Sequence, residues 1–326
     1  MRASARGWRS RGGRFVAVLA ALLLGVAGAA ARDVAFVTNQ SSDDLSIVDL
    51  ETMAVEATIP IGGKPAGVAV PPSGDRAYVT SPEAKSMAVI DTGSRTVLKR
   101  IALSGGPLGI AVHPSGAPVY VADWFEHQLF VIDPEAGTIL SRVDVGQSPS
   151  GVAVSPDGAI VVTADRDSDQ ISVIDATSLS VLRTIKVGAR PFGVSFSPDG
   201  ARVYAANVGS DSVSVVDWKA GTVVASVPVG QRPYVSVEAK GRVFVTDQYG
   251  GTVSVFDAAT REKLAAIPVG EYPEGIEAGA GEAFVYVASW FDNILTKIDA
   301  TTLEVVGTVE VGDGPRAFGR FIAARP

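Results

Sequence analysis

Two short stretches of the sequence combine a tryptophan, a phenylalanine and an acid. Trp124-Phe125-Glu126 and Trp290-Phe291-Asp292 share one register, each nine residues before an aspartate that ends an apolar run. Tyr249 takes the place of the phenylalanine in a third stretch of the same register. Aromatic side chains exposed in loops tend to mark interaction surfaces. We therefore predict that Trp124, Phe125, Trp290, Phe291 and Tyr249 contact a ligand or partner, unless the rings fold over and pack on neighbouring parts of the chain.

A second group of residues flanks the prolines of a recurring Val-Gly-x-x-Pro pattern. The positions directly before and after these prolines hold four cations and three aromatic residues: Lys64, Arg190, Phe192, Arg232, Tyr234, Tyr272 and Arg316. Arg and Lys gathered in one arc would suit an anionic or planar ligand. The alternative is that these cations pair with nearby acids such as Glu274 or Asp313.

Groups that could catalyse a reaction are few. His113 belongs to a recurring turn pattern, whereas His127 follows Trp124-Phe125-Glu126 and could serve as a ligand or base beside the predicted binding residues. Asp165-Arg-Asp167-Ser-Asp169 has the alternating acids of a calcium loop but lacks its glycine and distal glutamate. No nucleophile-elbow, zinc-protease or phosphate-loop pattern occurs. We predict no catalytic residues, metal or cofactor, and leave a divalent metal, a quinone or a haem open.

All these residues belong to a repeat that occurs seven times. Its aspartate recurs at steps of 42 residues, with one step of 40, at Asp49, Asp91, Asp133, Asp175, Asp217, Asp257 and Asp299. Each repeat has four runs rich in Val, Ile and Tyr, separated by Ser-Pro-Asp-Gly turns and by turns after the aspartate. Four-stranded repeats that bury both faces against their neighbours form a β-propeller. The sequence therefore predicts an all-β, seven-bladed β-propeller with four-stranded antiparallel blades.

The two ends of the repeat region predict how the ring closes. Residues Asp33–Asn39 match the second strand of a repeat, and Pro315–Ala323 match a first strand with nothing after it. One blade should therefore combine one C-terminal strand with three N-terminal strands, which leaves no open sheet edge. The predicted binding residues share one face of this ring, and the nearly uniform turns of the other face are interpreted as structural. The shorter Glu238-Ala-Lys-Gly241 turn is interpreted as a tolerated deletion.

Residues 1–31 have the pattern of a secretory signal peptide. Five arginines without an acid precede an apolar run from Phe15 to Val26, and Ala27-Gly-Ala29 and Ala29-Ala-Ala31 both suit cleavage. The run is short for a membrane anchor, which is the alternative. We expect export to the periplasm or secretion, no membrane span after cleavage, and a mature domain of residues 32–326.

Charge and composition exclude several function classes. Removal of the five arginines changes the net charge from −7 to −12, which disfavours non-specific binding to nucleic acid. The absence of cysteine excludes disulfides, thiolate metal sites, cysteine nucleophiles and covalent c-type haem. Stability after export must therefore come from a large core.

The repeat resembles the YVTN-type repeat of YncE-like β-propellers. Val203-Tyr-Ala-Ala-Asn207, Phe36-Val-Thr-Asn39, Ala77-Tyr-Val-Thr80 and Phe244-Val-Thr-Asp247 carry this resemblance, which covers residues 33–323. It implies a secreted or periplasmic propeller. Similar repeats occur beside quinoprotein dehydrogenases and in amine dehydrogenase subunits. One relative is associated with single-stranded DNA. Sugar lactonases and haem d1 domains resemble the family more distantly.

Three functions follow as hypotheses. The first is a monomeric binding or accessory protein that is not an enzyme. Its aromatic and cationic face would dock a partner protein or a small anionic ligand. The family resemblance suggests a redox protein as that partner. The second is an enzyme, either a lactonase-like hydrolase with a divalent metal held by Asp and Asn or a cofactor-bearing oxidoreductase subunit. The third is single-stranded nucleic acid binding, which the aromatic residues favour and the net charge opposes.

Overall fold

The computed structural model describes residues 1–3 and 33–324. The predicted signal peptide falls almost entirely outside the described residues. The unit from Ala31 to Pro326 contains every strand of the structure.

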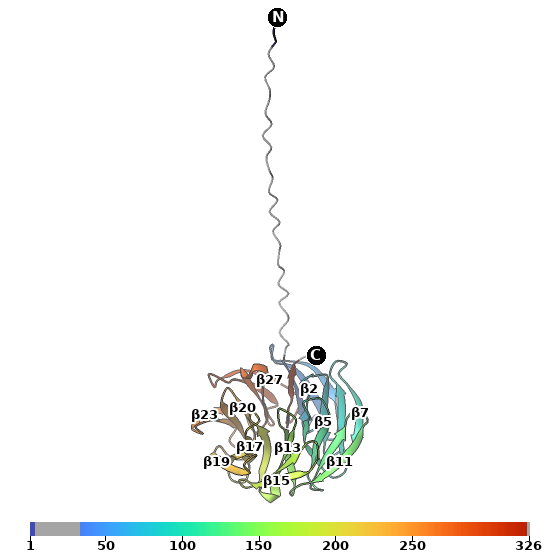
Figure 1. Ribbon diagram of the computed structural model, residues 1–326, viewed down its shortest axis with the longest axis vertical. Helices are drawn as coiled ribbons and strands as arrows, with labels where there is room; N and C mark the ends of the chain where they lie inside the picture. Colours follow the sequence, from blue (N-terminus) through green and yellow to red (C-terminus); the bar gives the residue numbers. More distant parts are fainter. Residues whose placement is uncertain (4–32, 325–326) are drawn as a thin grey trace. The chain divides into compact units, whose positions relative to one another are not determined.

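Seven four-stranded antiparallel sheets form the blades of a propeller, so the predicted fold is confirmed. Figure 1 shows the outermost strands β7, β11, β15, β19 and β23 at the periphery of the ring. From the centre outward, blade 1 contains β28 (Ile322–Ala324), β1 (Asp33–Asn39), β2 (Asp44–Asp49) and β3 (Ala54–Pro60). Blade 2 contains β4 (Val68–Ala69), β5 (Arg76–Ser81), β6 (Ser86–Asp91) and β7 (Thr96–Ala102). Blade 3 contains β8 (Pro107–Val112), β9 (Val119–Asp123), β10 (Gln128–Asp133) and β11 (Thr138–Asp144).

The remaining four blades repeat this order. Blade 4 contains β12 (Pro149–Val154), β13 (Ile160–Asp165), β14 (Gln170–Asp175) and β15 (Val181–Lys186). Blade 5 contains β16 (Pro191–Phe196), β17 (Val203–Asn207), β18 (Ser212–Asp217) and β19 (Thr222–Pro228). Blade 6 contains β20 (Pro233–Ala239), β21 (Arg242–Asp247), β22 (Thr252–Asp257) and β23 (Lys263–Pro268). Blade 7 contains β24 (Pro273–Ala278), β25 (Phe284–Ser289), β26 (Ile294–Asp299) and β27 (Val305–Glu310), and two short 3-10 helices are Arg166–Ser168 and Ala280–Glu282.

The burial of each strand follows from its place in the blade. Second strands such as β13 are buried along their whole length because adjacent blades cover both sheet faces. Outermost strands such as β11 alternate between exposed and covered residues, as a strand with one solvated face should. No helix among the described residues is long and apolar enough to cross a membrane.

The turn after each repeat aspartate depends on the aspartate side chain. Asp175 Oδ1 accepts hydrogen bonds from the backbone N–H groups of Thr177 and Ser178, at 3.1 and 2.7 Å. The Ser178 N–H holds the pKa of Asp175 below its usual value, because hydrogen bonding favours the charged carboxylate. The recurring aspartates therefore shape turns, as their recurrence with the repeat suggests.

The ring closes as the sequence predicts. β28 pairs antiparallel with β1, with Val34 opposite Ala323. β28 is shorter than the predicted Pro315–Ala323 run, but Pro315 also forms a bridge with Asn39, and Phe36 N–H donates to Phe321 O at 2.8 Å. Residues between these points also contact the inner strand of blade 2. Val68 N–H, for example, donates to Phe318 O at 3.0 Å.

Candidate functional site

Two faces of the ring differ in their connections. We call the face with the Val-Gly-x-x-Pro loops and the loops between second and third strands the loop face. The opposite face, with the Ser-Pro-Asp-Gly turns and the turns after the repeat aspartates, is the turn face. Every residue that the sequence analysis assigned to binding lies in a loop-face connection or at the loop-face end of an inner strand.

Part of the predicted site fills the central channel at the loop face. Phe192 and Tyr234 are 8% and 3% exposed, and their ring centroids lie 4.3 Å apart. Phe318, also buried, lies 5.2 Å from Phe192 and 5.5 Å from Tyr234. Trp124 folds over this group, 6.2 Å from Phe192. These four rings pack as a small core, so Phe192 and Tyr234 offer little surface to a ligand.

A chain of polar side chains runs beside the buried rings. Arg316 Nε donates to Glu274 Oε2 at 2.7 Å, and its guanidinium also bonds to the Tyr234 hydroxyl. Gln248 Nε2 donates to Glu274 Oε1 at 2.7 Å, and Arg232 Nε donates to Gln248 Oε1 at 2.6 Å. Burial lowers the pKa of Arg316, but Glu274 and Tyr234 raise it by more, so the guanidinium stays charged. The pairing with Glu274 that the sequence left open therefore holds for Arg316.

Four other aromatic residues remain accessible on the outer part of the loop face. Tyr249 and Phe291 are 54% and 52% exposed, and Tyr272 lies between them with ring centroids 5.3 Å from Tyr249 and 4.6 Å from Phe291. Trp290 continues the row at 4.7 Å from Phe291. The Arg232 guanidinium lies 4.9 Å from the Tyr249 ring. We call Tyr249, Tyr272, Trp290, Phe291 and Arg232 the rim strip.

The other predicted residues lie apart from the rim strip. Phe125 is 70% exposed. Lys64 Nζ lies 3.4 Å from the Asp43 carboxylate. Arg190 is exposed, and its guanidinium forms no hydrogen bond or ion pair with a described residue. Arg166 is a site residue that the sequence did not single out, and its guanidinium lies 5.4 Å from the Trp124 ring. Arg166 and Trp124 occupy the same repeat position in neighbouring blades, so the repeat spacing could have predicted that they lie close together.

His127 has a contact that recurs in the repeat. Its Nδ1 accepts a hydrogen bond from Ser148 N–H at 3.0 Å, and its backbone is left-handed with φ of 59°. Asp169 and Asp211 accept the equivalent bond from Arg190 and Arg232, also across 21 residues. A neutral imidazole that accepts at Nδ1 carries its hydrogen on Nε2. His127 thus connects the loop of blade 3 to the loop that leads into blade 4, while its ring remains exposed.

The acids and amides at the ends of the second strands are bound by their own loops. Asp123 accepts from Gly106 N–H and Asp247 from Gly230 N–H, each at 3.0 Å. Asp165 accepts from the Ser172 hydroxyl at 2.6 Å. Burial raises the pKa of Asp165 and of Asp247. Residues 33–324 contain no group of three His, Asp or Glu side chains placed to hold a metal ion.

A family model described as YNCE-like beta-propeller matches residues 20–114 and 108–231, which together cover more than half of the chain. The chain belongs to the YNCE-like beta-propeller family. No curated protein matches it.

Solved structures share the fold of this YNCE-like propeller at low sequence identity. A chain of Kuenenia stuttgartiensis hydrazine synthase is 21% identical with a TM-score of 0.71, covering 78% of this chain and 89% of that one. A functionally unknown protein from Desulfotomaculum acetoxidans DSM 771 is 16% identical with a TM-score of 0.74, covering 88% and 99%. At these identities the likeness shows the fold alone.

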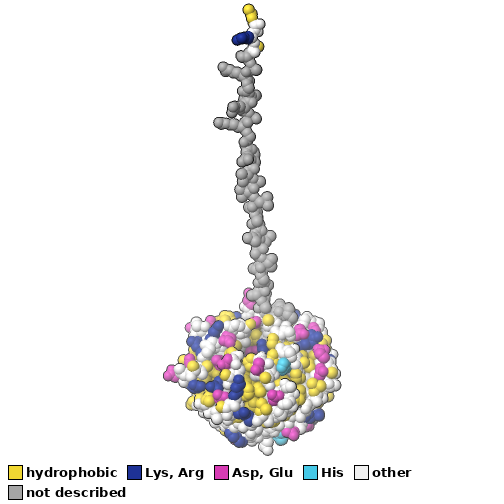
Figure 2. All heavy atoms as spheres, viewed as in Figure 1, with side chains coloured by type: hydrophobic (Ala, Val, Ile, Leu, Met, Phe, Trp, Pro, Cys, Tyr) yellow, Lys and Arg dark blue, Asp and Glu magenta, His cyan; other side chains and the backbone are white. Residues whose placement is uncertain are grey.

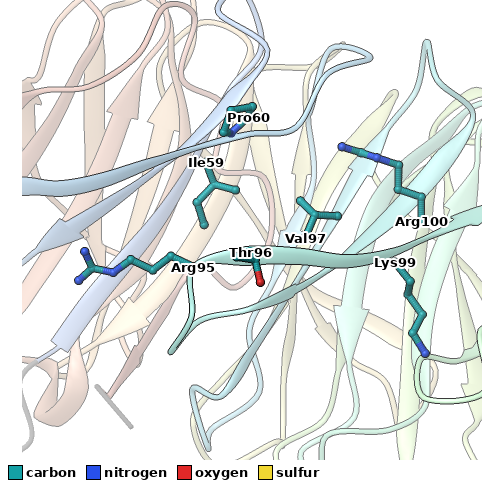
Figure 3. Close-up of a pocket in the computed structure, with 7 residues that line it drawn as sticks. All are labelled: Ile59, Pro60, Arg95, Thr96, Val97, Lys99 and Arg100. Carbon is teal, nitrogen blue, oxygen red and sulfur yellow. The ribbon is translucent and has the colours of Figure 1, made fainter.

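Two hollows of this YNCE-like propeller lie outside the rim strip. A shallow groove of about 540 Å³ lies between β3 and β7. In Figure 3 the side chains of Arg95, Lys99 and Arg100 point in different directions, so they form no common binding point. A cavity of about 460 Å³ occupies the central channel and opens among the Ser-Pro-Asp-Gly turns. Figure 2 shows hydrophobic side chains near the middle of the face in view, among scattered acids and bases.

Proposed function

We propose that this YNCE-like propeller is an exported binding protein without catalysis of its own, which docks an acidic partner protein on the rim strip. The observation that carries this proposal is the row of accessible aromatic rings at the tips of loops from blades 6 and 7, more than half exposed at Tyr249 and Phe291. Exposed aromatic residues on a rigid scaffold are characteristic of binding hot spots.

The charges near the strip support an acidic partner. Arg232 is half-buried beside Tyr249, and Arg190, which is exposed without a described partner, lies in the equivalent loop one blade away from the strip. These two cations would orient an acidic surface at the blade 6 end of the strip, whereas the exposed Glu271 and Asp292 lie at its blade 7 end. The family resemblance makes a periplasmic redox protein, such as a quinoprotein dehydrogenase, the first partner to test. The likeness to hydrazine synthase concerns the fold alone and supports no activity for this chain.

The backbone beneath the strip supports docking without large rearrangement. Trp290 N–H donates to Tyr272 O at 2.9 Å, and Gln248 N–H donates to Arg232 O at 3.1 Å, so backbone bonds join the two loops on each side. A pre-ordered surface loses little conformational entropy when it binds.

Site-directed photocrosslinking tests the docking proposal. A photoreactive residue at position 291, in cells of the native organism, should capture one acidic protein, whereas the same residue at Leu140 should not. Leu140 is a matched control because it is 60% exposed on the outer strand β11. With the captured protein purified, Tyr249→Ala plus Phe291→Ala should weaken its affinity at least tenfold, and Leu140→Ala should leave it unchanged. Equal affinities for both variants would refute docking on the strip, and an oligonucleotide captured instead would favour the nucleic acid hypothesis.

Export is part of the same proposal. The intact mass of the chain recovered from the periplasm or medium should correspond to a start after Ala29 or Ala31. A chain in that fraction that still begins at Met1 would contradict cleavage.

A further inference from the structure

The cavity in the central channel is a blind funnel. Its mouth lies among turn residues such as Pro114, Pro156 and Pro198, and its walls are formed by the inner strands β8, β12, β16, β20 and β24. At the other end the buried rings of Phe192, Tyr234 and Phe318 close the channel. A volume of about 460 Å³ lies within the range of small-molecule pockets.

Polar residues on the funnel wall interrupt the repeat on adjoining blades. Ser195, Ser236, Glu238 and Glu277 belong to β16, β20 and β24. Glu238 faces Val243 across its blade, whereas the apolar Val112 and Val154 hold this place opposite Val119 and Val161 in blades 3 and 4. The remaining wall is apolar, from residues such as Val152, Val194 and Phe196. Ring closure uses Glu277 but not Glu238, so Glu238 is the carboxylate available for a role in the funnel itself.

The carboxylates differ in how well they are paired. Glu277 already has partners within the protein. Its Oε2 accepts hydrogen bonds from Phe321 N–H and Ile322 N–H, and Arg320 Nε lies 3.5 Å from its Oε1. Glu238 Oε2 accepts from the Tyr204 hydroxyl at 2.6 Å, and its other oxygen forms no hydrogen bond with a described residue.

The negative charge of the funnel wall comes from Glu238 and from Glu282 at the mouth, because burial raises the pKa of Glu277 to about 8 and keeps it protonated at neutral pH. Arg320 is the single cation among the lining residues. Partial burial raises the pKa of Glu238 because it disfavours the charged carboxylate. A cation at the open oxygen would stabilise that charge. The hydroxyls of Ser195 and Ser236, 3.2 Å apart on the same side, can bind further polar hydrogens.

We infer that the funnel binds a small organic cation, a protonated amine with an apolar body. The ammonium group donates to the open oxygen of Glu238, and the apolar body lies along Val152, Val194 and Phe196. Charge excludes an anion of the same shape, and a neutral analogue loses the charge-assisted hydrogen bond. This site lies in a different part of the ring from the rim strip and does not depend on partner docking.

Three probes of one shape test the inference by isothermal titration at pH 7 on the mature chain. 4-Phenylbutylammonium should bind with one site per chain, at least tenfold more tightly than 4-phenylbutanol and 4-phenylbutyrate. Glu238→Gln should weaken the ammonium at least fivefold and leave the alcohol unchanged, because glutamine keeps the bond from Tyr204 but loses the charge. Glu310→Gln, on the exposed end of β27, is the matched control and should change nothing.

Filling the funnel provides a second variant. Val154→Trp should abolish binding of both the ammonium and the alcohol, and its melting curve reports whether the fold is kept. The methyl NMR signals of Val152 and Val194 should shift with the ammonium in the unaltered chain. No binding of the ammonium, binding of the butyrate with equal affinity, or an unchanged affinity in Glu238→Gln would each overturn the inference.

Discussion

His127 shows how a residue that looks functional can carry a structural contact. It occupies the left-handed loop position that Asp169 and Asp211 occupy in other blades, and its ring nitrogen accepts the same backbone hydrogen bond. Asn293 does the same for Gly314 at 2.9 Å. Asparagine and aspartate tolerate this backbone conformation better than most residues. The contact therefore needs an acceptor of suitable reach, and an imidazole is one of several that fit.

Substitution of His127 should separate these roles. His127→Asn should keep nearly full stability because asparagine supplies an acceptor and favours positive φ. His127→Ala should lose about 1–2 kcal/mol, since it removes the hydrogen bond and strains the backbone. Urea denaturation of both variants measures the difference. If the asparagine variant were as unstable as the alanine variant, the bond to Ser148 would not explain the residue.

At the scale of elements, the closing strand is held by a side chain from the neighbouring blade. β28 pairs with β1 through only three residues, and Glu277 of β24 binds the backbone N–H groups of Phe321 and Ile322 from the other side. Burial raises the pKa of Glu277 to about 8, although Arg320 and the two N–H groups act to lower it. A short strand that forms the last closure is thus coupled to one titrating carboxyl group.

This pKa predicts a pH dependence of stability. Between the ordinary value of 4.5 and about 8, the folded chain holds a proton on Glu277 that the unfolded chain releases. Stability should therefore fall as pH rises through this range and level off above it. Glu277→Gln should flatten that part of the curve, measured as urea midpoints from pH 4.5 to 8.5. An identical slope in Glu277→Gln and in the exposed control Glu310→Gln would contradict the assignment.

At the scale of the whole ring, closure depends on residues at the end of the described chain. Ala317, Phe318 and Phe321 are at most 3% exposed, and Phe318 also supports the rings that close the channel. Their loss would open an edge on β1 and remove packing from blades 1, 2 and 7. Ring closure and the channel core are therefore one cooperative feature.

Deletion of residues 316–326 should abolish cooperative folding near physiological temperature. The smaller change Phe321→Ala should cost about 3–5 kcal/mol, as expected for a fully buried phenylalanine. Thermal melting by circular dichroism measures both variants. A truncated chain that melts close to the full-length value would refute the closure account.

The repeat spacing alone determined the number of blades, the place of ring closure and the role of the turn aspartates. These features depend on local interactions, namely β-branched runs, turn residues and the Asp side chain that binds the next few N–H groups. Pro315–Ala323 could be assigned to the first blade because a propeller with an unpaired edge strand is unstable. Such information is contained in each repeat and in its period.

The tertiary structure decided which predicted site residues are accessible. Phe192 and Tyr272 flank prolines of the same pattern, yet one ring points into the channel core and the other lies on the rim strip. Arg316 reaches Glu274 across 42 residues, and Glu238, read from the sequence as part of a shortened turn, lines the funnel. These outcomes depend on side-chain size and direction where three or more blades meet. A repeat that specifies each blade locally does not specify that meeting point.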